Sequence, residues 1–302
     1  MSQTIPFDQS RPQSGHLEQV SPLLRRWVTN NPGPFTFTGT CAYVVGSRKV
    51  AVIDPGPGMA GEAEALLKAL GSETVENIVV THTHRDHSPG ARALKAITNA
   101  PISGCAPHWS ARKLNLGERN ILDASADLAH QPDKAMADGD VLEGHGYRLT
   151  AIETPGHTMN HLCFALAEEN MLFSGDHVMA WSTTIVAPPD GSMAAYMASL
   201  EKLRGRSETV YWPGHGGPVT DPARFLRGLI GHRKMREASI LAAVQREAST
   251  IPMLVEKLYE GLAPGLKGAA ALSVFAHLED LAMRDLIMAD DQASLDSIYR
   301  AA

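Results

Sequence analysis

The stretch that decides the fold is THTHRDH, residues 81–87, which places three histidines and an aspartate within six positions. It directly follows NIVV, residues 77–80, an apolar run typical of a buried strand. Alternate side chains of an extended chain share a face, so His82 and His84 project to the same side. Asp86 and His87 follow where the chain turns into a helix, and they face a second point. The stretch therefore predicts two pairs of ligands, one for each of two metal ions.

Three later loops supply further ligands, each after an apparent strand and each with a glycine directly before the ligand. They are TPGHT at 154–158, FSGDH at 173–177 and WPGHGG at 212–217. Glycine lets the backbone approach closely, and an aspartate has two oxygens that can bridge two ions. A single loop histidine is usually an ordinary polar side chain, but the joint pattern favours a metal site. The predicted sets, with room for one shared water, are His82, His84, His157 and Asp176 for one ion, and Asp86, His87, Asp176 and His215 for the other.

Composition excludes several other classes of protein. The chain has 302 residues and a net charge of -6, which indicates one large domain, or a domain with an appendage, and no general affinity for nucleic acid or anionic membranes. No apolar run approaches the ~20 residues of a membrane span, and the first sixteen residues do not resemble a secretory signal. Cys41, Cys105 and Cys163 are too few and too scattered for a disulfide framework or a thiolate site. We therefore expect a cytoplasmic protein with nitrogen and oxygen ligands.

The hydrophobic pattern predicts strands mixed with helices from residue 35 to 219 and a loop over residues 1–20. Residues 35–45 and 50–58 form a predicted hairpin. A helix over 62–70 ends at Gly71, and a second over 91–97 follows Ser88 as cap and Pro89. These elements predict an α/β sandwich with sheets inside and helices outside. Further strands are expected near 101–104, 147–153, 161–166, 171–173 and 209–211, with a helix near 194–203.

The chain changes character near residue 220. Asp221 and Pro222 open a predicted helix through about residue 246, and two more helices follow over 252–262 and 267–286, before a short polar tail. This pattern is compatible with a helix-turn-helix or winged-helix unit. We expect two domains, 1–220 and 221–302.

The order HxHxDH, GHT, SGD and PGHG resembles that of the metallo-β-lactamase-fold hydrolases, over roughly residues 20–220. The resemblance includes IDPG at 53–56. It implies a four-layer αββα sandwich with the metal ions at the edge between the sheets, and it implies that Asp54 holds a ligand imidazole. Zinc is the default metal, although manganese or iron suits such ligands as well. HRKMRE at 232–237 and the helical tail resemble the winged-helix appendage of the β-lactamase-like protein 2 endoribonucleases.

Two cations flanking one water lower its pKa from about 15.7 to about 7, which supplies a metal-bridged hydroxide to attack a carbonyl or phosphorus. Asp86 is the candidate catalytic residue that orients this water. His108, His177 and Trp181 are candidate substrate-pocket residues. The alternative for the two histidines is a structural role. The stretch 181–190 forms either a rim over the site or a plain connector. His232 and Arg236 lie four apart on one helix face and could bind an anion, or could be part of a solvated surface.

Three classes of function compete: a hydrolase of small esters or thioesters, as in the hydroxyacylglutathione hydrolases that the core resembles; a single-strand-specific endoribonuclease; and a non-catalytic binding module. A structural metal site would have a closed ligand set, often rich in cysteine, which disfavours the third. Residues 201–302 carry 13 Lys and Arg against 13 Asp and Glu, so an RNA-binding surface is not evident. The missing secretion signal disfavours β-lactam hydrolysis. We expect a small-molecule ester or thioester substrate, with RNA as the alternative and no membrane partner; the sequence does not indicate an oligomeric state.

Overall fold

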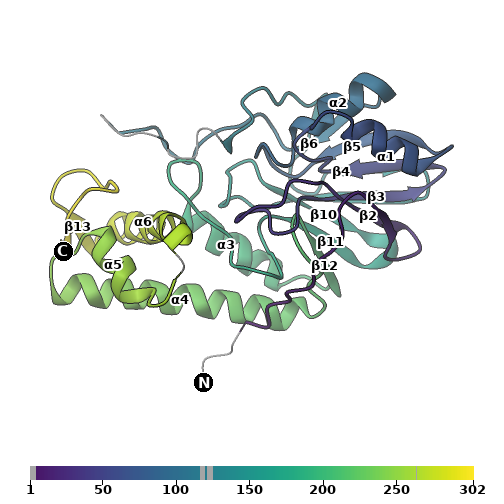
Figure 1. The fold of residues 1–302 in the computed structure, drawn as a ribbon. Coiled ribbons are helices and arrows are strands. Elements are labelled where there is room, and N and C mark those ends of the chain that lie inside the picture. The colour runs from purple at the N-terminus through teal and green to yellow at the C-terminus, as the bar shows by residue number, and fades with distance from the viewer. Residues whose placement is uncertain (1–4, 116–119, 121–124, 263) are drawn as a thin grey trace.

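The computed structural model describes residues 5–115, 120, 125–262 and 264–302. Two β-sheets face each other and helices cover the outer face of each, so the predicted four-layer αββα sandwich is confirmed (Figure 1). The helices of the sandwich are α1 (Glu62–Leu70) and α2 (Pro89–Thr98) over the first sheet, and α3 (Met193–Arg204) and α4 (Pro222–Arg246) over the second.

The first sheet has the strand order β1 to β7 and is antiparallel up to β4 and parallel from β4 onward. Its strands are β1 (Leu17–Gln19), β2 (Leu24–Val28), β3 (Cys41–Ser47), β4 (Lys49–Ile53), β5 (Thr74–Val80), β6 (Ile102–Gly104) and β7 (Lys134–Ala135). The second sheet has the order β12-β11-β10-β9-β8, and only its β11–β12 pair is parallel. Its strands are β8 (Val141–Gly144), β9 (Tyr147–Glu153), β10 (Leu162–Leu166), β11 (Met171–Gly175) and β12 (Val210–Pro213).

Strand β10 shows why the layers stack in this way. All five of its residues are buried. Leu162, Phe164 and Leu166 face the core between the two sheets, whereas Cys163 and Ala165 face the core under α3 and α4. Because alternate side chains point to opposite faces, an unbroken apolar run is what a strand covered on both sides requires.

Several predicted boundaries are wrong. The strand expected from residue 35 begins at Cys41, because Phe37 adopts a positive φ of 56° and the Asn31 side chain accepts a hydrogen bond from the Thr40 N–H at 2.9 Å, which holds a loop there. Strand β1 lies within the region expected to be a loop. The Ser88 hydroxyl does not cap α2; it donates to Asp127 instead, at 2.7 Å.

The three predicted C-terminal helices are present, as α4, α5 (Ile251–Leu258) and α6 (Lys267–Met283), and short 3₁₀ turns occur at Ala167–Glu169 and Pro264–Leu266. The expected polar tail instead forms a hairpin of β13 (Ile287–Ala289) and β14 (Tyr299–Ala301), whose polar residues lie in the turn. Helix α4 belongs to two cores. Phe225 and Leu229 pack under the second sheet, whereas Ile240 and Val244 pack with α5 and α6. The C-terminal helices are thus continuous with the sandwich; the domain division near residue 220 stays a prediction.

Candidate metal centre

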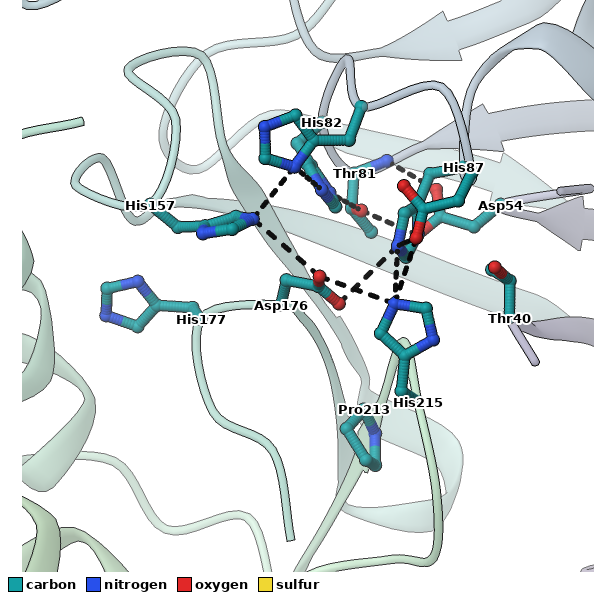
Figure 2. Close-up of polar contacts among 12 residues, drawn as sticks. Thr40, Asp54, Thr81, His82, His87, His157, Asp176, His177, Pro213 and His215 are labelled. Carbon is teal, nitrogen blue, oxygen red and sulfur yellow. Dashed lines mark hydrogen bonds and ion pairs between the residues drawn. The ribbon is translucent and has the colours of Figure 1, made fainter. Parts of the chain in front are cut away.

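All the predicted ligands lie in loops that follow strands, at one edge between the two sheets. The loop with His82 follows β5, and Asp54 follows β4. In the second sheet the three ligand loops follow β9, β11 and β12. Figure 2 shows Asp176 between the His157 side of the cluster and the His215 side. The structure therefore brings the seven predicted ligand residues together at this edge.

The first group consists of His82, His84, His157 and Asp176, whose ligand atoms all lie within 4.8 Å of one another. Nδ1 of His84 lies 3.2 Å from Nε2 of His82 and 2.9 Å from Nε2 of His157. Nε2 of His157 lies 3.7 Å from Oδ2 of Asp176. All four side chains are buried. Four nitrogen and oxygen donors converging on one point is the arrangement that a tetrahedral divalent ion needs.

The second group consists of Asp86, His87 and His215, again within 4.8 Å. Nε2 of His215 lies 3.1 Å from Oδ2 of Asp86 and 3.3 Å from Nε2 of His87. Asp176 also reaches this group, because its Oδ1 lies 3.5 Å from Nε2 of His87 and its Oδ2 lies 3.5 Å from Nε2 of His215. Oδ1 of Asp176 is buried without a hydrogen-bond donor among the described residues. This carboxylate is placed to contribute to both groups.

Asp54 accepts hydrogen bonds that fix the residues beside the ligand groups. Its Oδ2 accepts from Nδ1 of His87 at 3.0 Å and from the Thr81 hydroxyl at 2.6 Å, and its Oδ1 accepts from the Thr81 N–H at 2.8 Å. The Thr81 hydroxyl also lies 3.0 Å from Nδ1 of His82. Asp54, His82 and His87 could themselves form a third ligand group, but these three contacts already occupy the carboxylate. The geometry suits the predicted role of fixing an imidazole.

The electrostatics divide the cluster into two parts. Burial lowers the pKa of His82, His84 and His157, that of His84 to about 3, so these rings are neutral and offer lone pairs. Burial would also lower the pKa of His87, but Asp86 and Asp176 raise it to about 10. The two carboxylates thus favour positive charge between them. Neutral imidazoles beside carboxylates that attract a cation are a donor set that fits divalent metal ions.

The three predicted substrate-pocket residues lie outside both ligand groups. His108 has Nδ1 2.9 Å from the Thr83 hydroxyl and Nε2 3.5 Å from Asp190. His177 is fully buried, packs on Tyr196 with ring centroids 4.6 Å apart, and points away from the ligands (Figure 2). Trp181 stacks on Phe37 at 4.9 Å. Contact of these residues with substrate stays a prediction.

Sequence reasoning assigned no role to Thr81 or Asn160. Thr81 is the first residue of the opening motif, so its position was visible even though its link between Asp54 and His82 was not. Asn160 donates to the Thr83 hydroxyl at 2.9 Å and to the Ala106 carbonyl at 2.8 Å, and no local signal marks it. His161 also received no role, and it accepts from the Asp176 N–H through Nε2 at 3.2 Å.

Asp190 stabilises the loops beside the cluster, and its replacement tests this. Burial would raise the pKa of Asp190, but hydrogen bonds from His108 and Ser110 lower it to about 2. Its contribution is therefore present above about pH 4 and lost as the pH falls towards 2. We expect Asp190→Asn to lower the free energy of unfolding by about 2 kcal/mol at pH 7 and by less at pH 3. Urea unfolding at both pH values measures this, and an equal loss at both would contradict it.

Comparison with known proteins agrees with this geometry. The family model of the metallo-beta-lactamase superfamily matches residues 35–215. The lactamase-like protein adaB of Aspergillus niger is 30% identical over 268 residues, which cover 83% of this chain and 77% of that protein. An atrochrysone carboxyl ACP thioesterase of Aspergillus terreus is 30% identical over 78% of this chain and 67% of its own length. The chain belongs to the metallo-β-lactamase superfamily, and it is a hydrolase of that fold.

Solved structures extend the likeness of fold to the C-terminal helices. A beta-lactamase domain protein from Burkholderia ambifaria has a TM-score of 0.78 at 18% identity, over 99% of this chain and 97% of that one. A metallo-beta-lactamase family protein from Thermus thermophilus has a TM-score of 0.74 at 22% identity, over 94% of this chain and 100% of that one. Among the described helices, none combines the length and the hydrophobicity that crossing a bilayer demands.

Proposed function

We propose that this chain hydrolyses thioesters or small esters at a site for two divalent metal ions. The observation that carries the proposal is the pair of ligand groups that share Asp176. His82, His84, His157 and Asp176 would hold one ion, and Asp86, His87, Asp176 and His215 the other. Zinc is our first choice, with manganese or iron as alternatives. When bound, such ions supply a hydroxide nucleophile at neutral pH and polarise the substrate carbonyl.

The residues of the chain provide orientation and proton transfer. Asp86 is the most exposed of the seven ligand residues, with 27% of its side chain accessible, so it lies where water and substrate enter. Burial would raise its pKa, but His87 and His215 hold it well below the usual range, so it is ionised at neutral pH. As the new C–O bond forms and the C–S bond breaks, the Asp86 carboxylate accepts the proton carried by the attacking hydroxide and passes it to the leaving thiolate.

The names of the relatives favour a thioester over a phosphodiester. Several are called atrochrysone carboxyl ACP thioesterases, including those of Aspergillus terreus and Claviceps purpurea. These proteins match about four fifths of this chain, and the family model includes all seven ligand residues. We infer that the substrate here is also a thioester of a small acyl group, and we keep a cytoplasmic location as part of the proposal.

The alternative of RNA cleavage rests on the resemblance to a winged-helix appendage, where five positive charges within residues 224–236 could contact RNA. In the structure Arg224, Arg227 and Lys234 are exposed, but Arg233 is buried and Arg236 is half-buried. One of the five charges is thus withdrawn from the surface that RNA could contact, and a second is partly covered. Three helices and a hairpin stay compatible with a winged-helix unit, and we keep that assignment as a proposal. The same holds for the resemblance to the β-lactamase-like protein 2 subgroup.

A paired assay on metal-loaded protein tests the proposal, with a panel of thioesters and esters in one arm and a fluorescent single-stranded RNA in the other. We expect thioester turnover that falls about 100-fold or more in Asp86→Ala, because a positioned proton acceptor contributes at least that much. Full activity of this variant with both metal ions retained would remove the role given to Asp86. RNA cleavage that disappears in the variant, with the thioesters intact, would replace the thioester proposal with the endoribonuclease.

A further inference from the structure

A cavity of about 400 Å³ lies between the 179–185 segment and the C-terminal helices α4 and α6. Its walls are mostly apolar and include four aromatic side chains, those of Phe7, Phe35, Trp181 and Tyr259. Phe35 and Leu266, two of its lining residues, are exposed, so the cavity is open to solvent. Its size and lining are typical of a site for an organic ligand rather than of a gap in packing.

Two arginines of α4 line this mostly apolar cavity. Arg233 is 3% exposed; its guanidinium donates to the Thr184 carbonyl and lies 5.2 Å from the ring centroid of Tyr196. Arg236 donates to the Leu258 carbonyl at 2.6 Å and lies 4.0 Å from the ring centroid of Tyr259. The Nε atom of each is buried without a hydrogen-bond partner among the described residues. Each arginine therefore has one buried donor without a partner, and both arginines line the cavity.

Neither arginine forms an ion pair with an acidic residue in the part of the chain that the structure describes. Two other basic side chains nearby do form such pairs. Lys234 pairs with Glu201, and Arg284 pairs with Glu237. The two histidines beside the arginines are uncharged at neutral pH. Burial, and then the charges of Arg233 and Arg236, lower the pKa of His232 to about 4 and that of His277 to about 3. A buried cation without a counter-ion is energetically unfavourable. An anionic group bound in the cavity would compensate these two positive charges.

The cavity shares a wall with the metal centre. The segment from Trp181 to Ile185 lines the cavity. The Ile185 carbonyl of this segment accepts from Nδ1 of His157 at 2.6 Å, and the Thr184 hydroxyl donates to the Asp176 carbonyl at 2.7 Å. Trp181 itself lies against Gly216, the residue after the ligand His215. A small molecule in the cavity is therefore separated from the predicted metal-binding residues by a single chain segment.

We propose that the acyl part of the substrate reaches past the 181–185 segment into the cavity, and that Arg233 and Arg236 bind a carboxylate carried by that acyl group. The inference rests on the proposed thioester hydrolysis and narrows its substrate to aromatic acyl thioesters with a free carboxylate. The aromatic walls accept a flat ring system, and the fork of donors in a guanidinium matches the two oxygens of a carboxylate. This gives the helical tail a function: it supplies the charged wall of the substrate pocket.

Direct binding tests the anion site without relying on catalysis. Isothermal titration of metal-loaded protein with 2-naphthoate, and with the neutral 2-naphthamide as its match, compares a carboxylate with an uncharged ligand of the same shape. We expect Arg236→Gln to weaken naphthoate binding about tenfold or more, because a hydrogen bond to a charged group is lost. Arg227→Gln is the matched control, an exposed arginine of the same helix. Binding that persists in Arg236→Gln and disappears with a chelator would place the carboxylate on the metal ions and overturn the inference.

Turnover of matched thioesters tests the substrate class. The pair is the N-acetylcysteamine thioester of 2-naphthoic acid and the same compound with a carboxylate at position 6. We expect the ratio of kcat/KM for the carboxylated over the neutral thioester to fall about tenfold in Arg236→Gln. Arg233→Gln should behave alike, with thermal unfolding as the check of its fold, since Arg233 also holds Thr184. An unchanged ratio overturns the inference. The coenzyme A thioester of 2-naphthoic acid is assayed as well, and a loss confined to this compound would also overturn the inference, because the arginines would then bind its phosphate groups. If naphthoate binding depends on Arg236 but no thioester is hydrolysed, the cavity assignment stands and the proposed function fails.

Discussion

Replacing Asp176 with asparagine is expected to lower thioester turnover by about 10³-fold or more. The side chain keeps its size, but one carboxylate oxygen becomes an NH₂ group that cannot ligate and the negative charge is lost. Asp176 is the residue whose two oxygens reach both ligand groups, so the change weakens both ion sites together. A metal ion supplies several kcal/mol of transition-state stabilisation, and each 1.36 kcal/mol is tenfold in rate. Turnover and metal content of the same preparation measure the two effects.

Asp127→Asn provides the matched control for Asp176→Asn. Asp127 is also a buried aspartate, but it pairs with Arg92 and Ser88 outside the ligand groups. We expect this variant to retain its metal ions and its turnover. If Asp176→Asn kept wild-type turnover with both ions bound, the assignment of a shared carboxylate would be wrong.

Asp54→Asn is expected to weaken metal binding about 10- to 100-fold, the usual effect of removing a group that orients a ligand. The carboxylate accepts from Nδ1 of His87 and from two donors of Thr81. An amide NH₂ would face at least one of these donors and turn the His87 ring. Asparagine also tolerates the positive φ of 48° at this position, so the backbone is undisturbed. Competition with a metal indicator dye measures the affinity.

Thr81→Val separates the two halves of this network. It removes the hydroxyl that joins Asp54 to His82 but leaves the contact of Asp54 with His87. We expect a smaller loss of metal affinity than in Asp54→Asn. A larger loss in Thr81→Val would show that His82, and not His87, is the ring that this network holds in place.

The local parts of the site were readable from the sequence, because a strand, a turn and a helix start lie within a few residues of THTHRDH. The glycines before His157, Asp176 and His215 marked the other ligand loops in the same way. Strand β2 was missed because its sequence, LRRWV, carries two charges where a buried strand usually has none. Its arginines are neutralised by residues elsewhere in the fold, Arg25 by Glu73 and Arg26 by Glu18. Such pairing is tertiary and leaves no local pattern.

The cavity beside the metal centre could not be predicted for the same reason. Its walls come from the N-terminal segment at Phe7, the loop at Phe35, the 181–185 segment and two helices of the C-terminal region. In the sequence Arg233 and Arg236 belong to a group of positive charges at 224–236, and His232 and Arg236 share a helix face that could bind an anion or be solvated. Packing of α4 against the sandwich buries Arg233, and contact with the end of α5 half-buries Arg236, whereas Arg224 and Arg227 stay exposed.

The most direct test of the account is a titration of chelator-treated protein with Zn²⁺ while thioester hydrolysis is followed. Two ligand groups that share Asp176 predict turnover that rises with added zinc and levels off at two ions per chain. Turnover that levels off at one ion per chain, or that does not depend on the metal, would contradict the dinuclear site.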